Sequence, residues 1–181
     1  MSITITEALA EIKTIGKRIE KKRESMATYF ARQEGVRDPL EKNGGSAAFI
    51  AAERQAVGDL EQRLITLRRA IQTANDETSV TINSTTRTVS EWLTWRRDVA
   101  PGQRSWLSIV RATLVRVRES AQKQGNAVLS SVAQIGDSKP TDIVVNVDEV
   151  EIATAAETLE DTLGQLDGQL SLKNATVFVK I

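Results

Sequence analysis

The sequence contains no cysteine and no histidine. Without cysteine the chain can form no disulfide bond, thiol nucleophile or thiolate metal site. Without histidine it lacks the usual general base near neutral pH and the commonest ligand of transition metals. Walker, GxGxxG and nucleophile-elbow motifs are also absent. We therefore expect a protein that is not an enzyme, with no catalytic residues, cofactor or metal ligands. Catalysis by glutamate or lysine alone stays open, but no motif marks a site for it.

Aromatic residues are scarce, at 4%, so the core must be mainly aliphatic. The formal net charge is zero, and no overall field attracts nucleic acid or an anionic membrane. No stretch approaches the roughly 20 apolar residues of a membrane span. The N-terminal residues also lack the apolar region of a signal peptide. These absences predict a cytoplasmic protein with no membrane partner.

The chain is rich in apolar residues at alternating steps of three and four, the spacing of a helical packing seam. Thr4 and Glu7 have capping-box spacing and mark the start of the first helix. Lys22 interrupts the seam and must reach solvent or face a carboxylate. The helix is expected to end in the loop QEGVRDPLEKNGG, residues 33–45. The seam consists of Ile5, Ala8, Ile12, Ile15, Ile19, Lys22, Met26 and Tyr29.

A second seam of similar length follows this loop. Because one loop joins the two seams, they predict a long antiparallel, coiled-coil-like helical hairpin over residues 1–77. The second seam consists of Ile50, Glu53, Val57, Leu60, Leu64, Leu67, Ile71 and Ala74.

The segment SVTINSTTRTVSEW, residues 79–92, interrupts the helical pattern with small, β-branched and polar residues in a period of two. It predicts a β-hairpin over residues 78–89. Thr88 and Glu91 also have capping-box spacing, which is compatible with a hairpin of only a few residues. With Ser84 and Thr85 as the turn, the cross-strand pairs would be Val80 with Val89 and Ile82 with Arg87.

An isolated two-stranded hairpin is marginal in water, so the hairpin needs a third strand or a packed face. Residues 142–147 and 176–181 are candidate strands, and the sheet is expected to cap one end of a helical bundle. The terminal strand can complete this sheet within the chain or add to a second chain. We expect the second role to make the protein a homo-oligomer or a subunit of an assembly. The candidate interface residues are Val177, Phe178, Val179 and Ile181.

A third helical stretch begins near Trp92 and ends near Gln124, with Gly125 as its C-cap. Pro101–Gly102 should kink or split it. Its apolar positions are Trp106, Val110, Leu114, Val117 and Ala121.

The last helix follows a linker around residues 136–140 and begins near Asp148, with Glu151 three residues later. Its apolar positions are Ile152, Ala156, Leu159, Leu163, Leu166 and Leu170. We therefore predict a mainly α fold in a single helical domain, residues 1–181. Its parts are a helical hairpin (1–77), a β-hairpin (78–89), a kinked helix (90–124), a linker and strand (125–147), a helix (148–175) and a terminal strand (176–181).

Charge distinguishes the third and last helical stretches. Residues 96–123 contain seven basic and two acidic residues, whereas residues 142–173 contain eight acidic and one basic residue. Neighbours of opposite sign would set pairing and register, although an exposed ion pair contributes only about 0–1 kcal/mol. Internal pairing is thus the favoured role of the six arginines, with a nucleic-acid or protein partner as the alternative. The cluster consists of Arg96, Arg97, Arg104, Arg111, Arg116 and Arg118, with Trp92, Trp95 and Trp106 among them.

Two smaller clusters are interpreted as solvated helix faces. Glu157, Glu160 and Asp161 share one face and could hold Mg²⁺ or Ca²⁺, but no second carboxylate cluster accompanies them. The first helix carries a basic cluster that Glu20 and Glu24 interrupt. The alternative is a helical hairpin that binds RNA through phosphate contacts. Its candidate residues are Lys17, Arg18, Lys21 and Arg23, with Lys22 beside them.

Three segments, ALAEIKTIGKRIEKKR, INSTTRTVSEWLTWRRDV, and VVNVDEVEI followed by LGQLDGQLSLKNAT, resemble the septicolysin-like family of small helical proteins encoded by bacteria and phages. The resemblance spans most of the chain, but the Pro101–Gly102 break and the terminal VFVKI depart from it. It implies a helical bundle with no established activity, and it leaves a phage origin open.

We therefore expect a non-catalytic structural or assembly protein. It would self-associate or dock in a larger complex, such as a phage virion or the surface of a capsid. The first helical hairpin is also similar to the RNA-binding arm of seryl-tRNA synthetases. RNA binding by this hairpin is therefore the alternative function.

Overall fold

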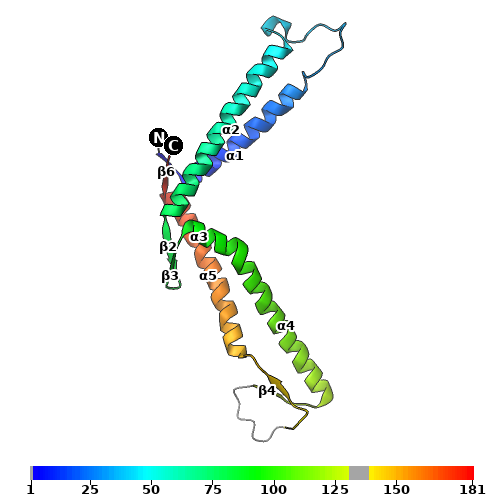
Figure 1. Ribbon diagram of the computed structural model, residues 1–181, viewed down its shortest axis with the longest axis vertical. Helices are drawn as coiled ribbons and strands as arrows, with labels where there is room; N and C mark the ends of the chain where they lie inside the picture. The colour runs from blue at the N-terminus through cyan, green and yellow to red at the C-terminus, as the bar shows by residue number, and fades with distance from the viewer. Residues whose placement is uncertain (1, 131–138) are drawn as a thin grey trace. The chain divides into compact units, whose positions relative to one another are not determined.

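The computed structural model describes residues 2–130 and 139–181 (Figure 1). Of these residues 71% are helical, which confirms the mainly α prediction with a small β element. Whereas we expected a single domain, the chain divides into two compact units. Unit 1 comprises Met1–Thr78 and Leu170–Ile181, and unit 2 comprises Ser79–Gln169. The expected linker at residues 136–138 lies outside the described residues.

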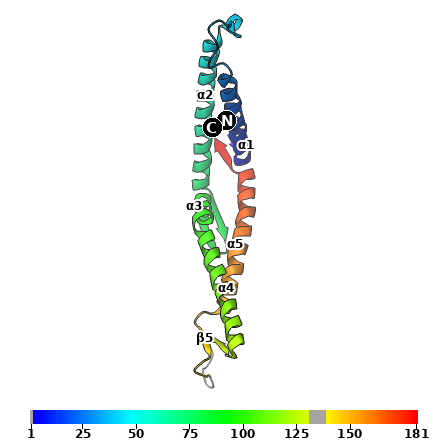
Figure 2. The ribbon, with the colours of Figure 1, turned by 90° about the vertical axis from the view of Figure 1, so that its right-hand side faces the viewer.

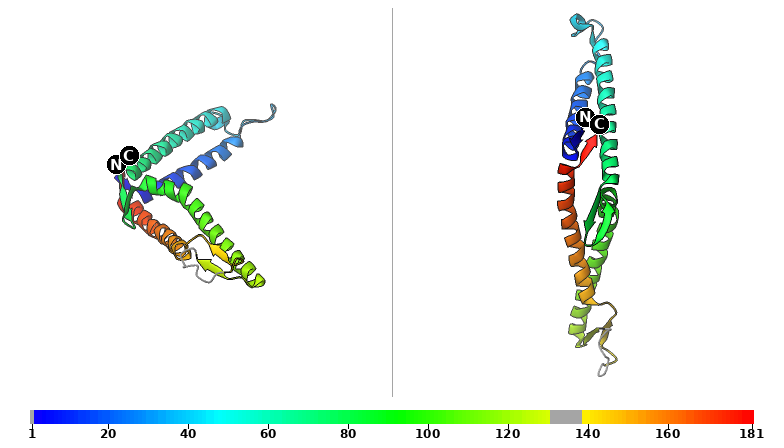
Figure 3. Two further views of the ribbon diagram at one scale, coloured as in Figure 1. Left: turned by 60° about the horizontal axis from the view of Figure 1, so that its bottom comes forward. Right: turned by 90° about the vertical axis from the view of Figure 1, so that its left-hand side faces the viewer.

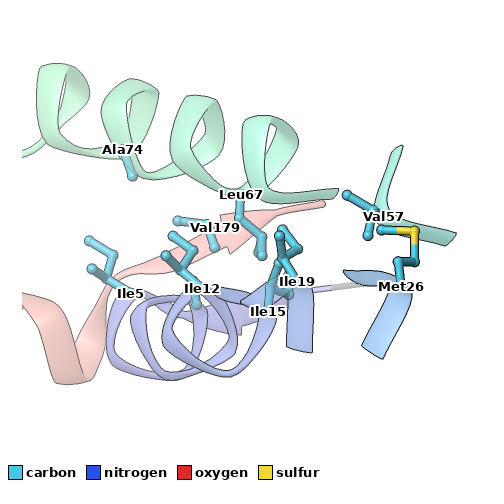
Figure 4. Close-up of a cluster of buried hydrophobic side chains, with 10 residues drawn as sticks. Ile5, Ile12, Ile15, Ile19, Met26, Val57, Leu67, Ala74 and Val179 are labelled. Carbon is cyan, nitrogen blue, oxygen red and sulfur yellow. The ribbon is translucent and has the colours of Figure 1, made fainter. Parts of the chain in front are cut away.

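Unit 1 is built on an antiparallel pair of helices, α1 (Ile5–Ala27) and α2 (Ser46–Glu77) (Figure 1). Thr4 and Glu7 form the predicted capping box, in which Glu7 N donates to Thr4 Oγ1 and Thr4 N donates to Glu7 Oε2. Residues of both predicted seams make the core, with Leu67 among the most completely buried side chains (Figure 4). The helical hairpin prediction is therefore confirmed.

Lys22, which interrupts the first seam, faces a carboxylate of the second seam. Its Nζ lies 2.9 Å from Glu53 Oε2, so the two polar seam positions neutralise each other. The helix α1 ends at Ala27, several residues before the expected loop. Tyr29 still contacts the opposite helix, because its ring packs edge-on against Phe49 at a centroid distance of 5.3 Å.

The loop between the two helices contains a short 3-10 helix, η1 (Glu41–Asn43), and is anchored by Asp38. The Asp38 carboxylate accepts hydrogen bonds from Leu40 N, Ser46 N and Ser46 Oγ. These bonds satisfy polar groups at the start of α2, where Gly45, the N-cap residue, has no side chain to do so.

Two short strands at the ends of the chain complete unit 1. The strand β1 (Ser2–Thr4) pairs antiparallel with β6 (Phe178–Lys180), and β6 lies against α2 (Figure 2). We expected the terminal strand to join the β-hairpin or another chain, but it pairs here with a three-residue strand too short to recognise in the sequence. Burial explains the choice, because Val179, 1% exposed, fills the core between α1 and α2.

The β-hairpin begins unit 2 and consists of β2 (Ser79–Ile82) and β3 (Thr85–Thr88). The predicted register was wrong: Val80 pairs with Arg87 and Ile82 with Thr85. The turn is formed by Asn83 (φ 46°) and Ser84 (φ 64°), both in the left-handed conformation that two-residue hairpin loops of type I′ require. Asparagine adopts that conformation more readily than threonine, which explains why the turn precedes the expected one by one residue.

No third strand joins this hairpin among the described residues. A packed face stabilises it instead, because Val80 and Ile82 are buried and Trp92 Nε1 donates to the Val80 carbonyl at 3.0 Å. The expected strand at residues 142–147 exists as β5 (Ile143–Val145). It pairs in parallel with β4 (Val128–Ser130), which we did not predict (Figure 3). Asp142 secures this pair by accepting hydrogen bonds from Ala127 N and Lys139 N.

The helical part of unit 2 is one interrupted helix and its antiparallel neighbour. The first consists of α3 (Val89–Thr94), a π-helical turn, η2 (Trp95–Val99), and α4 (Ala100–Gln124). The second is α5 (Glu149–Thr176), which belongs to unit 2 as far as Gln169. The predicted caps are confirmed: Thr88 and Glu91 form a capping box, Gly125 ends α4 with φ 69°, and Asp148 accepts from the first backbone amides of α5. Ala100 and Leu107 pack on Ile152 and Leu159 of α5.

Candidate functional site

The π turn sits just before Pro101 and accounts for the predicted break in the helix. Proline has no N–H for the carbonyl four residues earlier, and its ring crowds that carbonyl. A turn whose hydrogen bonds span five residues opens the helix there and inserts one extra residue into it. The insertion rotates everything that follows by about 100° relative to α3.

This rotation decides which side chains face the core. Trp106 lies two heptads after the buried Trp92, so a regular helix would place both on one seam. The structure instead buries Leu107, 6% exposed, and leaves Trp106 54% exposed. Our prediction that Trp106 belongs to the core stripe was therefore wrong, and the π turn is the physical reason. The later positions Val110, Leu114, Val117 and Ala121 are half-buried or buried, as predicted.

Trp106 forms part of the wall of a groove in unit 2 with a volume of about 920 Å³. The other walls come from the β2–β3 hairpin, from α3, the π turn and the start of α4, and from α5 as far as Thr162 with its cap Asp148. Most of its lining is apolar. The α5 side presents small residues at helical spacing: Thr154, Ala155, Thr158 and Thr162.

Aromatic contacts and hydrogen bonds hold the groove in shape. The ring of Trp92 packs edge-on against Trp95 at a centroid distance of 5.5 Å, and the Arg87 guanidinium lies 4.9 Å from the centroid of the Trp92 ring. At the other side, Asn83 Nδ2 donates to Thr162 Oγ1 at 2.9 Å. Gln165 Nε2 in turn donates to Asn83 Oδ1. The turn residue Asn83 therefore ties the hairpin to α5.

The groove carries two carboxylates in addition to Arg87. Asp148 caps α5, accepting from the backbone amides of Val150 and Glu151 at 2.8 and 3.2 Å. The Glu151 side chain makes no hydrogen bond or ion pair with the described residues. Val150, between them, is 74% exposed. The sequence reasoning missed this site, although a proline between two tryptophans in heptad register was a usable signal.

The six arginines of the basic stretch all have partners within unit 2. Arg96 pairs with Asp167 at 2.6 Å, Arg104 with Glu160 at 2.6 Å, and Arg118 with Glu149. Arg97 pairs with its neighbour Asp98. The last two donate to backbone carbonyls, Arg111 to that of Ala153 and Arg116 to that of Ala112. Pairing with the carboxylates of the acidic helix is thus observed for three of the six arginines, Arg96, Arg104 and Arg118.

The other predicted clusters are divided among different partners. Glu160 pairs with Arg104 and Asp161 accepts from Gln165 Nε2, whereas Glu157 lines a separate depression between α4 and α5. In the described part of the chain, no group of three or more acidic residues is placed to hold a metal ion. On α1, Lys22 and Arg23 pair with Glu53 and Glu61 of α2. The remaining basic residues, Lys17, Arg18 and Lys21, are exposed and make no ion pair with the described residues.

The predicted interface residues lie mostly inside unit 1. Val179 is buried, and Val177 and Ile181 pack against the same core. Phe178 points outward and is 62% exposed. Phe178 is therefore the most exposed of the four, and Val177 and Ile181 are half-buried.

The comparisons with known proteins add a fold and no function. No protein-family model and no curated protein matches the chain. The structure is similar to a crystal structure of a functionally unknown conserved protein from Corynebacterium diphtheriae, with a TM-score of 0.55 and 18% sequence identity. The match covers 99% of this chain and 100% of that one. Within the described residues, every helix is too short or too polar to cross a membrane.

Proposed function

We propose that this protein is a non-catalytic interaction module that docks in a protein assembly, and that the groove of unit 2 is its docking surface. The observation that carries the proposal is Trp106, more than half exposed on the wall of an apolar groove. Exposed tryptophans in grooves are typical anchors of protein–protein interfaces. Val150 and Ile109, also exposed, extend the apolar surface.

The length of the groove favours a protein segment over a small ligand. Its α5 side reaches from Asp148 to Thr162, about 20 Å at 1.5 Å per residue. A helix of about 14 residues has this length, whereas a small ligand would fill only part of the groove. The polar groups of the groove also support binding rather than chemistry, because Asn83, Arg87 and Asp148 are engaged in holding the fold.

The assembly is either a homo-oligomer or a larger complex with other subunits. The zero net charge does little to oppose self-association. The resemblance to phage-encoded septicolysin-like proteins makes a phage virion or capsid surface the proposed setting of the larger complex.

The test compares Trp106→Ser with Ile65→Ser, a matched change at an exposed apolar residue of α2 outside the groove. Light scattering measures self-association, and affinity capture from the native host measures other subunits. We expect the Trp106 variant to lose assembly and the Ile65 variant to keep it. An intact chain that is monomeric and captures no partner would contradict the proposal, as would two variants that behave alike.

A second candidate function is RNA binding by unit 1. It is favoured by Lys17, Arg18 and Lys21, whose charges have no acidic partner among the described residues. Binding would weaken steeply with salt, because each neutralised phosphate releases counterions. Gel retardation of tRNA at about 50 mM salt tests it. Lys17→Glu should abolish retardation and Lys42→Glu, in the loop between α1 and α2, should not. No retardation of tRNA or single strands by the intact chain would remove this candidate.

A further inference from the structure

The charges of unit 2 are unevenly matched. The ion pairs between α4 or the π turn and α5 use Asp167, Glu160 and Glu149. Four of the six arginines of the basic stretch pair with a carboxylate, and Arg111 and Arg116 donate to backbone carbonyls. The helix α5 keeps further carboxylates with no basic partner in the described part of the chain. The start of α5 therefore presents carboxylates without a basic partner, and part of this acidic surface lies in the groove.

Within the groove the carboxylates without a basic partner are that of Glu151 and that of Asp148, whose Oδ1 also caps the first turn of α5. Arg87, the cation of the lining, stacks on Trp92. Trp106 and Val150 provide exposed apolar surface near these carboxylates. The groove thus combines apolar walls with negative charge at one end.

The small side chains on the α5 side indicate what shape fits. Threonine and alanine at steps of one, three and four residues leave room for a helix to approach closely along α5. A helix laid there would bury Trp106 and complete a three-helix arrangement with α4 and α5. Helices that dock in such grooves present apolar residues at steps of three and four.

We propose that the groove binds a basic amphipathic helix of a partner protein, with apolar residues against Trp106 and a lysine or arginine facing Asp148 and Glu151. This inference rests on the proposed docking function and names the chemistry of the partner. The carboxylates stabilise a cationic side chain and repel both an acidic helix and the phosphates of a nucleic acid. A cation near Trp106 also gains from the face of the indole ring.

The experiment uses the full-length protein and two labelled synthetic peptides of about 14 residues, the length of the groove at 1.5 Å per residue. One is an amphipathic leucine–lysine helix, and its counterpart replaces every lysine with glutamate. Fluorescence anisotropy measures binding of each peptide. We expect the lysine peptide to bind and the glutamate peptide to bind at least tenfold more weakly.

Charge and anchor variants locate the binding site. Glu151→Lys and Trp106→Ala should each weaken binding of the lysine peptide at least tenfold. Glu157→Lys, the same charge change on α5 at a residue that does not line the groove, should leave it nearly unchanged. All three residues are exposed, so the variants should keep their helicity, which circular dichroism checks.

Several results would overturn the inference. One is equal binding of the two peptides, and another is an equal effect of Glu151→Lys and Glu157→Lys on peptide binding. A third is that the intact protein binds a single-stranded oligonucleotide and the Trp106→Ala variant does not. If the lysine peptide fails to bind but Trp106→Ser still disrupts assembly, the docking function stands and the partner chemistry is wrong. If neither effect occurs, both are wrong.

Discussion

Single side chains determine where the helices of this protein begin. Thr4 and Thr88 each form a capping box with a glutamate three residues later, and Asp148 caps α5 alone. Each cap satisfies backbone amides that the helix leaves free. Asp38 differs because it lies in the loop eight residues before Ser46, the first residue of α2, and still binds it. It therefore holds the loop closed as well as the helix end.

Asp38 should make the stability of unit 1 depend on pH. Hydrogen bonds from the Ser46 hydroxyl, then from the amides of Ser46 and Leu40, hold the pKa of Asp38 below its ordinary value of 3.8. A lowered folded-state pKa means that the unfolded chain takes up the proton first. The stabilisation is thus complete above the ordinary pKa and is lost as the pH falls through the folded one. Asp38→Asn should lower the melting temperature at neutral pH and flatten its decline in acid. The control Asp59→Asn, at an exposed position of α2, should leave the melting temperature at neutral pH unchanged.

Among the elements, the β2–β3 turn offers a direct test of backbone strain. Ser84 adopts φ 64°, a conformation that costs a residue with a β-carbon roughly 1–2 kcal/mol. Glycine removes this cost but gains entropy in the unfolded chain. Ser84→Gly should therefore stabilise the protein by about 0.5–1 kcal/mol in urea unfolding. Glycine at Thr85, a strand position, should destabilise it by a similar amount; a loss of stability in the Ser84 variant would contradict the type I′ assignment.

Because of the π turn before α4, truncation of two adjacent residues should have unequal effects on stability. Leu107 is buried against α5 and Trp106 is exposed, so Leu107→Ala should cost about 2–4 kcal/mol of unfolding free energy. Trp106→Ala should change it by less than about 1 kcal/mol despite removing a larger side chain. Thermal or urea unfolding of the two variants measures the difference. The reverse order would show that α3 and α4 form one regular helix with Trp106 on the seam.

At the scale of the whole molecule, the two ends of the chain stabilise unit 1 together. The strand β6 pairs with β1 and inserts Val179 into the core of the helical hairpin. Deleting residues 176–181 should therefore lower the melting temperature of unit 1. Phe178→Ser should leave it unchanged, because that side chain is exposed. Light scattering on the same variants separates the two roles of the strand: loss of assembly in the Phe178 variant alone would place an interface there instead of in the groove.

The sequence by itself determined the features that depend on residues a few positions apart. The seams of α1, α2 and α5, the capping boxes and the C-cap at Gly125 all follow from spacings of three and four residues. The opposite charges of α4 and α5 could also be predicted from the sequence, because each helix carries one dominant sign. These interactions are local or repeat along an element, so the pattern survives without knowledge of the fold.

Only the tertiary structure decided which strands pair and where the groove lies. Strand pairing joins residues as distant as Ser2 and Lys180, and a three-residue strand carries too little pattern to identify its partner. The groove depends on one residue inserted at the π turn, which moves Trp106 off the seam that its spacing from Trp92 predicts. Burial of Leu107 on α5 selects that rotation, and it depends on packing between helices far apart in the sequence.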